Sequence, residues 1–242
     1  ALGTVLFIFS YSAALLYEHA TKGIANEFFI NVGSIGSYDL EFGWVVDGLS
    51  IMMYFVVGTV SSLVFIYATN YMQGEIRYTF FFTSLTLFAG SMLVLVSSPT
   101  LLQLLIGWEL VGVCSYLLIG HYWEKKENSS AAMKAFITNK IADVGLMIGI
   151  IVLALSTKTL RISEILYQST HDYADIKTVA YLGGVLLFIG AMGKSAQFPL
   201  HVWLPDAMAG PTPVSALMHA ATMVTAGVYL LGRMFPFYQG MA

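Results

Sequence analysis

Long apolar stretches dominate this sequence and constrain its fold more than any other feature. The hydrocarbon core of a bilayer is about 30 Å thick, and a helix of roughly 20 apolar residues crosses it. Stretches of this kind recur along the chain, and only 10% of its 242 residues are charged, against about 25% in a soluble globular domain. The chain is therefore expected to lie in a membrane, which excludes a cytosolic enzyme, a disordered chain and a nucleic-acid binder.

The apolar stretches lack the alternation of a lipid-facing barrel strand, so helices are the expected spanning structure. The candidate spans are residues 2–17, 48–70, 78–97, 100–122, 132–156, 178–198 and 212–235. The predicted fold class is an all-α, polytopic membrane protein with a bundle of about seven transmembrane helices. Residues 1–242 are expected to form a single transmembrane domain. The first stretch is short and begins without a methionine, which favours a truncated helix and a chain that is a fragment at both ends.

Two long polar segments separate these spans. Residues 18–47 are predicted to form a polar loop, and the partial alternation from Tyr38 to Val46 within it indicates a small surface hairpin. Residues 157–177 are predicted to form a second long loop.

Prolines concentrate in one short segment. Four of the six prolines, Pro199, Pro205, Pro211 and Pro213, lie within residues 199–213. Each proline removes a backbone donor and clashes with the preceding turn, so this segment cannot be one unbroken helix. Either the helix that carries Lys194 is discontinuous around Lys194–Pro205, or the segment is an interfacial loop. Broken helices at membrane depth occur where they line a polar cavity.

Five ionisable residues lie well inside the apolar spans: Glu109, Lys140, Asp143, Lys194 and His219. A charge near the bilayer centre costs roughly 2.5–3.5 kcal/mol. Such residues need partners or water, and together they indicate a path for ions or protons.

Glu109 and Lys194 form the central hypothesis. Glu109 lies ten residues after Pro99, which is about 15 Å along a helix, and Gly107 and Gly112 beside it predict close approach of another backbone. Neither Glu109 nor Lys194 has an opposite charge within a helical turn, so each is predicted to be the partner of the other in a switchable pair. The alternatives are a protonated, purely structural Glu109 and a Lys194 that extends to the membrane interface.

Three further residues extend the predicted relay. Lys140 and Asp143 are three positions apart, so they share a helix face and can neutralise each other. Asp143 is the deeper of the two and the stronger relay candidate, and Lys140 is an accessory. His219 can pass a proton near neutral pH, with Thr222 as an accessory on a hydroxyl-lined face that can hold water. The alternative is a histidine buried for structural reasons.

Redox chemistry is not expected in this chain. The sequence has no trustworthy pair of heme-ligand histidines, no G-x-G-x-x-G after a strand and no Walker lysine. Its single cysteine, Cys114, excludes a cysteine-ligated zinc or iron–sulfur site. No cofactor and no metal is therefore expected here, and the chemistry is the movement of charge.

The segments around the buried charges resemble a known family. Residues 193–200 (GKSAQFPL) and 203–224 (WLPDAMAGPTPVSALMHAATMV) resemble the signature of the antiporter-like membrane subunits of respiratory complex I. Residues 107–112 (GWELVG) and 114–120 (CSYLLIG) resemble the largest of these subunits, which is subunit L in bacteria and subunit five in mitochondria. The resemblance extends over essentially the whole chain and implies that it covers the second to eighth helices of a longer subunit.

The resemblance also implies roles for single residues. It identifies Glu109 with the key glutamate of the family's fifth helix and Asp143 with the sixth-helix aspartate near the lysine. It identifies Lys194 with the lysine of the discontinuous seventh helix, and His219 with the histidine of the eighth.

The implied function is proton translocation in an NADH–quinone oxidoreductase, coupled to quinone reduction elsewhere in the complex. FMN, iron–sulfur clusters and quinone are then expected in partner subunits. The expected partners are other membrane subunits of complex I, the lipid bilayer and protons as the transported ion, with no nucleic acid. The expected location is the bacterial plasma membrane or the mitochondrial inner membrane. Three alternatives remain open: a subunit of a multisubunit sodium/proton antiporter, a photosynthetic relative with a ferredoxin donor, and a non-pumping structural scaffold.

Overall fold

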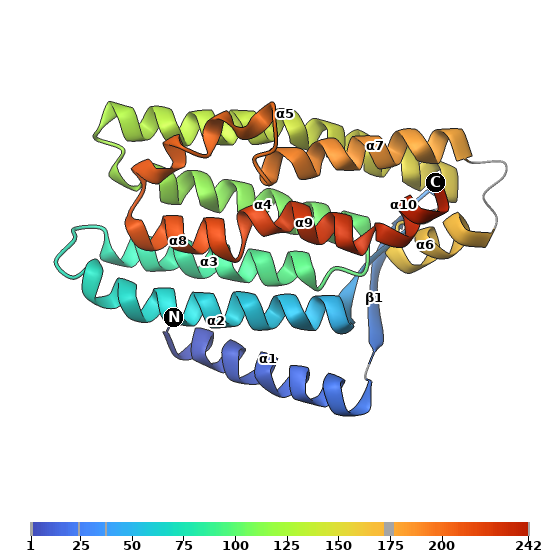
Figure 1. Ribbon diagram of the computed structural model, residues 1–242, viewed down its shortest axis with the longest axis horizontal. Coiled ribbons are helices and arrows are strands. Elements are labelled where there is room, and N and C mark those ends of the chain that lie inside the picture. Colours follow the sequence, from blue (N-terminus) through green and yellow to red (C-terminus); the bar gives the residue numbers. More distant parts are fainter. Residues whose placement is uncertain (1, 24, 37, 172–176, 242) are drawn as a thin grey trace.

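The computed structural model describes residues 2–23, 25–36, 38–171 and 177–241. Long helices lie side by side along one direction, and a two-stranded hairpin and two short helices cover one end of the bundle (Figure 1). The helices are α1 (Leu2–Lys22), α2 (Gly48–Tyr71), α3 (Tyr78–Val96), α4 (Leu101–Ile119), α5 (Lys126–Thr157), α6 (Ile162–His171), α7 (Lys177–Lys194), α8 (Thr212–Ala220), α9 (Met223–Arg233) and α10 (Phe235–Met241). The strands are β1 (Asn26–Ile35) and β2 (Tyr38–Val46), and single 3-10 turns form η1 (Gly120–Tyr122), η2 (Leu200–Trp203) and η3 (Asp206–Ala209).

Five helical segments of the described ranges are long and apolar enough to cross a bilayer. These are Gly48–Tyr71, Tyr78–Val96, Leu101–Tyr122, Lys126–Thr157 and Thr212–Arg233, while the apolar helix Val179–Lys194 is shorter. Large apolar side chains such as Ile141 and Leu155 remain more than half exposed on the outer faces, as lipid contact requires. The polytopic helical membrane fold is confirmed, and the count of seven spans stays a prediction.

The hairpin that the sequence indicated within Tyr38–Val46 is larger in the structure, because these residues form one strand, β2, and Asn26–Ile35 forms its partner, β1. The prediction that residues 18–47 form a loop was therefore wrong. Strands β1 and β2 pair antiparallel within this segment, and α1 extends into it as far as Lys22. The Gln103 side chain of α4 donates to the carbonyl of Gly43 and accepts from its amide. The backbone amide of Val45 donates to the carbonyl of Ser97. These bonds fix β2 onto the turn between α3 and α4.

The prediction that residues 157–177 form a loop was wrong for much of its length. Helix α6 occupies Ile162–His171, and residues 172–176 lie outside the described residues. Helix α6 has ten residues of mixed composition, so it does not show the long apolar stretch that predicts a membrane span. The backbone between α5 and α6 bonds to the start of α4, with Leu101 donating to Leu160 and Ile162 donating to Pro99.

Arg161, at the start of α6, joins this loop to the hairpin. Its guanidinium donates to both carboxylate oxygens of Glu41 at 2.5 and 2.6 Å and to Glu164 at 3.0 Å. It also lies 4.5 Å from the centre of the Phe29 ring on β1. Bidentate pairing of this kind fixes geometry as well as charge, so Arg161 holds the hairpin against the bundle.

Two helices are interrupted in the interior of the bundle. Helix α7 ends at Lys194, and the chain continues through η2 and η3 along α5 to the start of α8 (Figure 1, orange). The predicted discontinuity around Lys194–Pro205 is therefore confirmed, and the predicted span 178–198 ends earlier than expected. The predicted span 212–235 is also interrupted, because α8 ends at Ala220 and α9 begins at Met223.

The interruption between α8 and α9 is stabilised by Thr222. This residue is fully buried, and its hydroxyl donates to the carbonyl of Leu217 at 2.8 Å. The hydroxyl of Thr225 in turn donates to the carbonyl of Thr222. The expected hydroxyl-lined face thus has its hydrogens bound to the backbone, and Thr222 adds a second hydrogen bond to the Leu217 carbonyl, which also accepts the amide of Ala221.

The Glu41–Arg161 pair predicts a pH dependence of the hairpin's attachment. The hydrogen bonds from Arg161 hold the pKa of the Glu41 carboxyl below its usual value of 4.5. A lowered folded-state pKa gives stabilisation that is present above the usual value and is lost as the pH falls through the lowered one. We expect Glu41→Gln to reduce the free energy of hairpin opening at pH 7 by on the order of 1 kcal/mol. Amide hydrogen exchange of residues 26–46, corrected for its intrinsic pH dependence, measures this.

Wild type and Glu41→Gln should converge as the pH falls through the lowered pKa of the Glu41 carboxyl, because the carboxylate is then protonated and the charge-assisted pairing with Arg161 is lost. Glu164→Gln is the matched control, because Glu164 contacts Arg161 without contacting the hairpin. Equal protection of the hairpin in wild type and Glu41→Gln at pH 7 would contradict the assignment.

Candidate functional site

Lys194 is a fully buried charge at the C-terminal end of α7. Its exposed fraction is 0%, and a Cβ placed on Gly112 of α4 would lie only 2.8 Å from its Nζ. The ammonium therefore occupies the space that the missing side chain of Gly112 leaves. Its position in the last turn of α7 places it at the negative end of the helix dipole, which favours a positive charge.

The Lys194 ammonium has no hydrogen-bond partner among the described residues. The charged groups that interact with it electrostatically are Asp143 and Lys140, both on α5. Its Nζ also lies 5.7 Å from the centre of the Trp108 ring on α4, within the range of a cation–π contact. Asp143 is therefore the acidic group whose charge acts on Lys194, although no ion pair joins the two within the described residues.

Asp143 is held by Trp108. The carboxylate side chain is 2% exposed, and its Oδ1 accepts a hydrogen bond of 2.6 Å from the indole Nε1 of Trp108. The sequence interpretation did not assign a role to Trp108. A signal was present, because tryptophan in membrane proteins concentrates at the interfaces and a buried indole N–H needs an acceptor. A tryptophan beside a mid-span glutamate thus indicates a polar partner nearby.

Glu109 forms its ion pair with Lys140 of α5, and the prediction that Lys194 is its partner was wrong. The expectation that the partner comes from another helix is correct. Lys140 also lies 3.9 Å from the other Asp143 oxygen, Oδ2, so the expected Lys140–Asp143 pairing across three positions is present. Lys140, predicted only as an accessory, stands between the two carboxylates.

Close packing of α5 against α7 brings these charges together. A Cβ on Gly149 of α5 would lie 2.9 Å from the carbonyl oxygen of Gly183 on α7, and one on Gly193 would lie 2.2 Å from the Cβ of Ala142. Only glycine permits this separation, as is common between membrane helices. The expected close approach at Gly107 is also present, against the backbone of Leu95 on α3.

His219 lies in the last turn of α8, and Trp203 lies between it and the end of α7. The two ring centres are 6.2 Å apart, and the Trp203 indole donates to the carbonyl of Gly193 at 3.0 Å. Both ring nitrogens of His219 are buried without a hydrogen-bond partner in the described part of the chain. The structure thus brings His219 to the Lys194 segment through an aromatic contact.

These residues form a row of alternating charge from the outside of the bundle to its interior. Glu109 and Lys140 are 28% and 34% exposed, whereas Asp143 is 2% exposed and Lys194 is fully buried. Such a row can transmit a change of charge at its outer end to the amine at its inner end. Within the described ranges, no group of three or more His, Cys, Asp and Glu side chains is placed to hold a metal ion.

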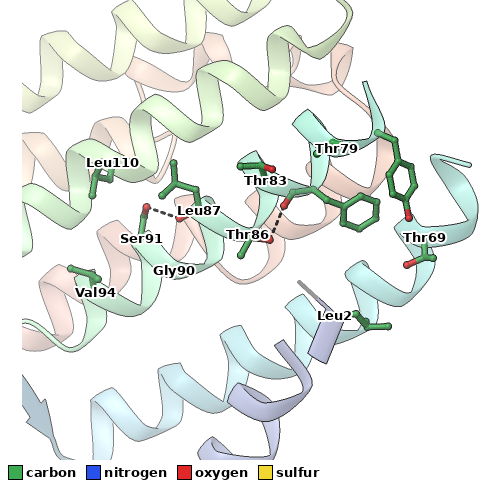
Figure 2. Close-up of a pocket in the computed structure, with 12 residues that line it drawn as sticks. Leu2, Thr69, Thr79, Thr83, Thr86, Leu87, Gly90, Ser91, Val94 and Leu110 are labelled. Atoms are coloured by element: carbon green, nitrogen blue, oxygen red, sulfur yellow. Dashed lines mark hydrogen bonds between the residues drawn. The ribbon is translucent and has the colours of Figure 1, made fainter. Parts of the chain in front are cut away.

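A pocket of about 940 Å³ lies away from this row, between the α1–α2 and α3–α4 helices (Figure 2). The hydroxyls of Thr86 and Ser91 in its wall donate to carbonyls of their own helix. These side chains therefore add little polarity, and the charged residues of the row do not line the pocket.

Comparison with known proteins identifies related sequences. Residues 98–242 match the family described as "NADH:quinone oxidoreductase/Mrp antiporter, TM", and residues 33–82 match "NADH-Ubiquinone oxidoreductase (complex I), chain 5 N-terminus". NAD(P)H-quinone oxidoreductase chain 5 of Synechocystis sp. is 47% identical over 94% of this chain and 34% of its own length. The chloroplastic subunit 5 of Anthoceros angustus is 46% identical over 93% of this chain and 30% of its own length. The chain thus spans about a third of the length of these curated relatives.

Two solved structures are similar in fold. A chain of the Mrp complex from Dietzia sp. is 28% identical with a TM-score of 0.78, over 95% of this chain and 27% of that one. A chain of the membrane-bound sulfane sulfur reductase, an archaeal respiratory membrane complex, has a TM-score of 0.83 at 20% identity, over 98% of this chain and 47% of that one. The second similarity shows the fold alone.

The close approach of Lys194 to Gly112 predicts that a larger side chain at position 112 impairs proton transport. Gly112→Ala places a methyl group 2.8 Å from the Lys194 Nζ, so the ammonium must move away from α4. We expect proton transport by the complete complex to fall by about tenfold, which corresponds to about 1.4 kcal/mol in the barrier. Gly90→Ala on α3 is the matched control, because a Cβ there meets no atom within 4 Å. Equal transport by both variants would contradict the assignment.

The Trp108–Asp143 bond makes a second prediction for this site. Trp108→Phe keeps an aromatic ring near Lys194 and removes the donor to Asp143, which leaves a buried carboxylate oxygen unpaired. Loss of a hydrogen bond to a charged group costs roughly 1.5–3 kcal/mol. We expect slower proton transport with normal assembly of the complex, measured in proteoliposomes. Trp44→Phe, in the hairpin, is the control that should transport normally; a Trp108→Phe variant as fast as Trp44→Phe would refute the role.

Proposed function

This chain belongs to the NADH:quinone oxidoreductase/Mrp antiporter family of membrane subunits, and we propose that it moves protons across a membrane as part of a NAD(P)H-quinone oxidoreductase. The observation that carries the proposal is the fully buried Lys194 ammonium, with which Asp143 on a neighbouring helix interacts electrostatically. A buried, partly compensated amine in a membrane helix is costly to maintain, and the transfer of a proton is the chemistry that it suits.

The position of Lys140 suggests how the amine is controlled. Lys140 pairs with Glu109 and lies 3.9 Å from Asp143 Oδ2. When Lys140 stays with Glu109, Asp143 is free to stabilise the protonated Lys194. When Lys140 moves to Asp143, it neutralises that carboxylate, and Lys194 then releases its proton more readily. In this scheme the proton passes from Lys194 towards His219, whose unprotonated ring nitrogen has no hydrogen-bond partner in the described residues and can accept it.

The energy for this movement is proposed to come from other subunits. The curated relatives are named as chains of NAD(P)H-quinone oxidoreductases, which supports the proposal that FMN, iron–sulfur clusters and quinone belong to partner subunits and that this chain holds none. Other membrane subunits and the lipid bilayer complete its surroundings. The bacterial plasma membrane and the mitochondrial inner membrane remain predictions, and relatives from cyanobacteria and chloroplasts add the photosynthetic membrane to them.

A second candidate is a subunit of a sodium/proton antiporter. The Mrp complex structure favours it, at 28% identity over 95% of this chain. The higher identity to the oxidoreductase chains, 47% and 46%, favours the first proposal. Co-purification separates the two, because flavin and iron–sulfur partners identify an oxidoreductase, and small membrane subunits without redox centres identify an antiporter.

Substitution of the charged row tests the proposal. In the complete subunit, assembled with its partners and reconstituted in proteoliposomes, we expect Lys194→Met, Asp143→Asn and Glu109→Gln each to lower proton pumping by about tenfold or more. A pH-sensitive dye measures the pumping. Lys134→Met is the control, because Lys134 lies on the same helix as Asp143 and pairs with the exposed Asp206.

Wild-type pumping in Lys194→Met and Glu109→Gln would end the proposal. Lower abundance of the complex with unchanged pumping by the surviving complexes would indicate a structural scaffold instead.

A further inference from the structure

Asn139, on α5, is a buried polar residue to which the mechanism above assigns no role. It is 2% exposed, and its Nδ2 donates to the carbonyl of Ala135 at 2.8 Å. A carbonyl can only accept, so this bond fixes the orientation of the amide and directs Nδ2 to the helix. The other end of the amide, Oδ1, is buried and has no hydrogen-bond partner in the described part of the chain.

The free Oδ1 of Asn139 faces the end of α7. A Cβ placed on Gly193, the residue before Lys194, would lie 3.9 Å from this oxygen. Asn139 also precedes Asp143 by four positions, so the two side chains lie on the same face of α5. The amide oxygen is therefore close to the segment that carries the amine, and on the side of α5 that carries Asp143.

Buried polar atoms without hydrogen bonds occur on three elements of this region, α5, α7 and α8. Acceptors without a hydrogen bond lie on α5, at Asn139 Oδ1 and at Asp143 Oδ2, which has Lys140 at 3.9 Å, and a donor without one lies on α7, at Lys194 Nζ. Both ring nitrogens of His219 on α8 are also free. Buried polar groups in proteins are almost always hydrogen-bonded, to the protein or to internal water. A molecule that both donates and accepts can satisfy acceptors and donors on neighbouring helices that do not bond each other directly, and water has this property.

We propose that Asn139 is a positioning residue for proton transfer: its Oδ1 accepts a hydrogen bond from a water molecule held between α5 and the end of α7, and so turns that water's oxygen towards the Lys194 ammonium. This inference rests on the proposed function. An amide oxygen suits the task because it does not titrate, so it orients the water without retaining the proton. A carboxylate at the same position would compete with Asp143 for Lys194.

Substitutions at Asn139 test the inference in the complete, assembled complex. Asn139→Leu has a similar size and removes both polar atoms, and Asn139→Ser restores a hydroxyl that can bind water. We expect Asn139→Leu to lower proton pumping by about tenfold, equivalent to about 1.4 kcal/mol, and to raise its solvent deuterium isotope effect. Asn139→Ser is expected to recover most of the pumping. Thr138→Val is the matched control, because it removes a hydroxyl from the adjacent position of the same helix.

The outcomes separate this inference from the proposed function. Proton pumping at the wild-type rate in Lys194→Met would contradict the proposed function, and it would contradict the role of Asn139 as well. Loss of pumping in Lys194→Met, with wild-type pumping and an unchanged isotope effect in Asn139→Leu, overturns the role of Asn139 alone. If the Asn139→Leu variant does not assemble into the complex, Asn139→Val takes its place in the experiment, because valine also lacks polar side-chain atoms and is smaller. Equal isotope effects in the valine and serine variants would then overturn the inference.

Discussion

The buried charge of Lys194 is the constraint on which the rest of the site depends. An ammonium inside a membrane protein is stable only if nearby groups replace the water that it has lost. Here the end of α7 supplies the negative pole of its dipole, α5 supplies Asp143, and α4 supplies an aromatic ring and the open space at Gly112. Three helices must therefore keep fixed distances from one another, and the glycine contacts between α5 and α7 maintain one of these distances.

The interruptions of the helices are connected with the same buried polar site. Continuous helices satisfy their own backbone groups and leave nothing for a polar site. Ending α7 at Lys194 and interrupting the chain between α8 and α9 places irregular backbone in the interior, and buried side chains donate additional hydrogen bonds to carbonyls beside these breaks. The Trp203 indole binds the Gly193 carbonyl, and the Thr222 hydroxyl binds that of Leu217. The irregular backbone is therefore packed inside protein, where a bilayer tolerates it.

The sequence predicted which residues are buried better than it predicted how they pair. Apolar stretches located Glu109, Asp143 and Lys194 within spans, and the prolines located the end of α7. The Glu109–Lys194 pair was wrong because spacing along one helix gives the face of a side chain and not the helix that packs against it. Lys140 seemed committed to Asp143 for the same reason, although the structure also gives it Glu109. Helix α6 was missed because it is too short for a span, and the break at Thr222 because nothing in an apolar run marks it.

The gradient of exposure along the charged row has a consequence for how the protein receives signals. Glu109 and Lys140 lie at the rim of the bundle, whereas Lys194 lies inside it. A molecule docked at the rim can therefore influence the interior amine through its electric field, without touching it and without bending a helix. The strength of such communication falls with distance and with the local dielectric constant. It is independent of the stiffness of the backbone, so a rigid protein can carry it as well as a flexible one.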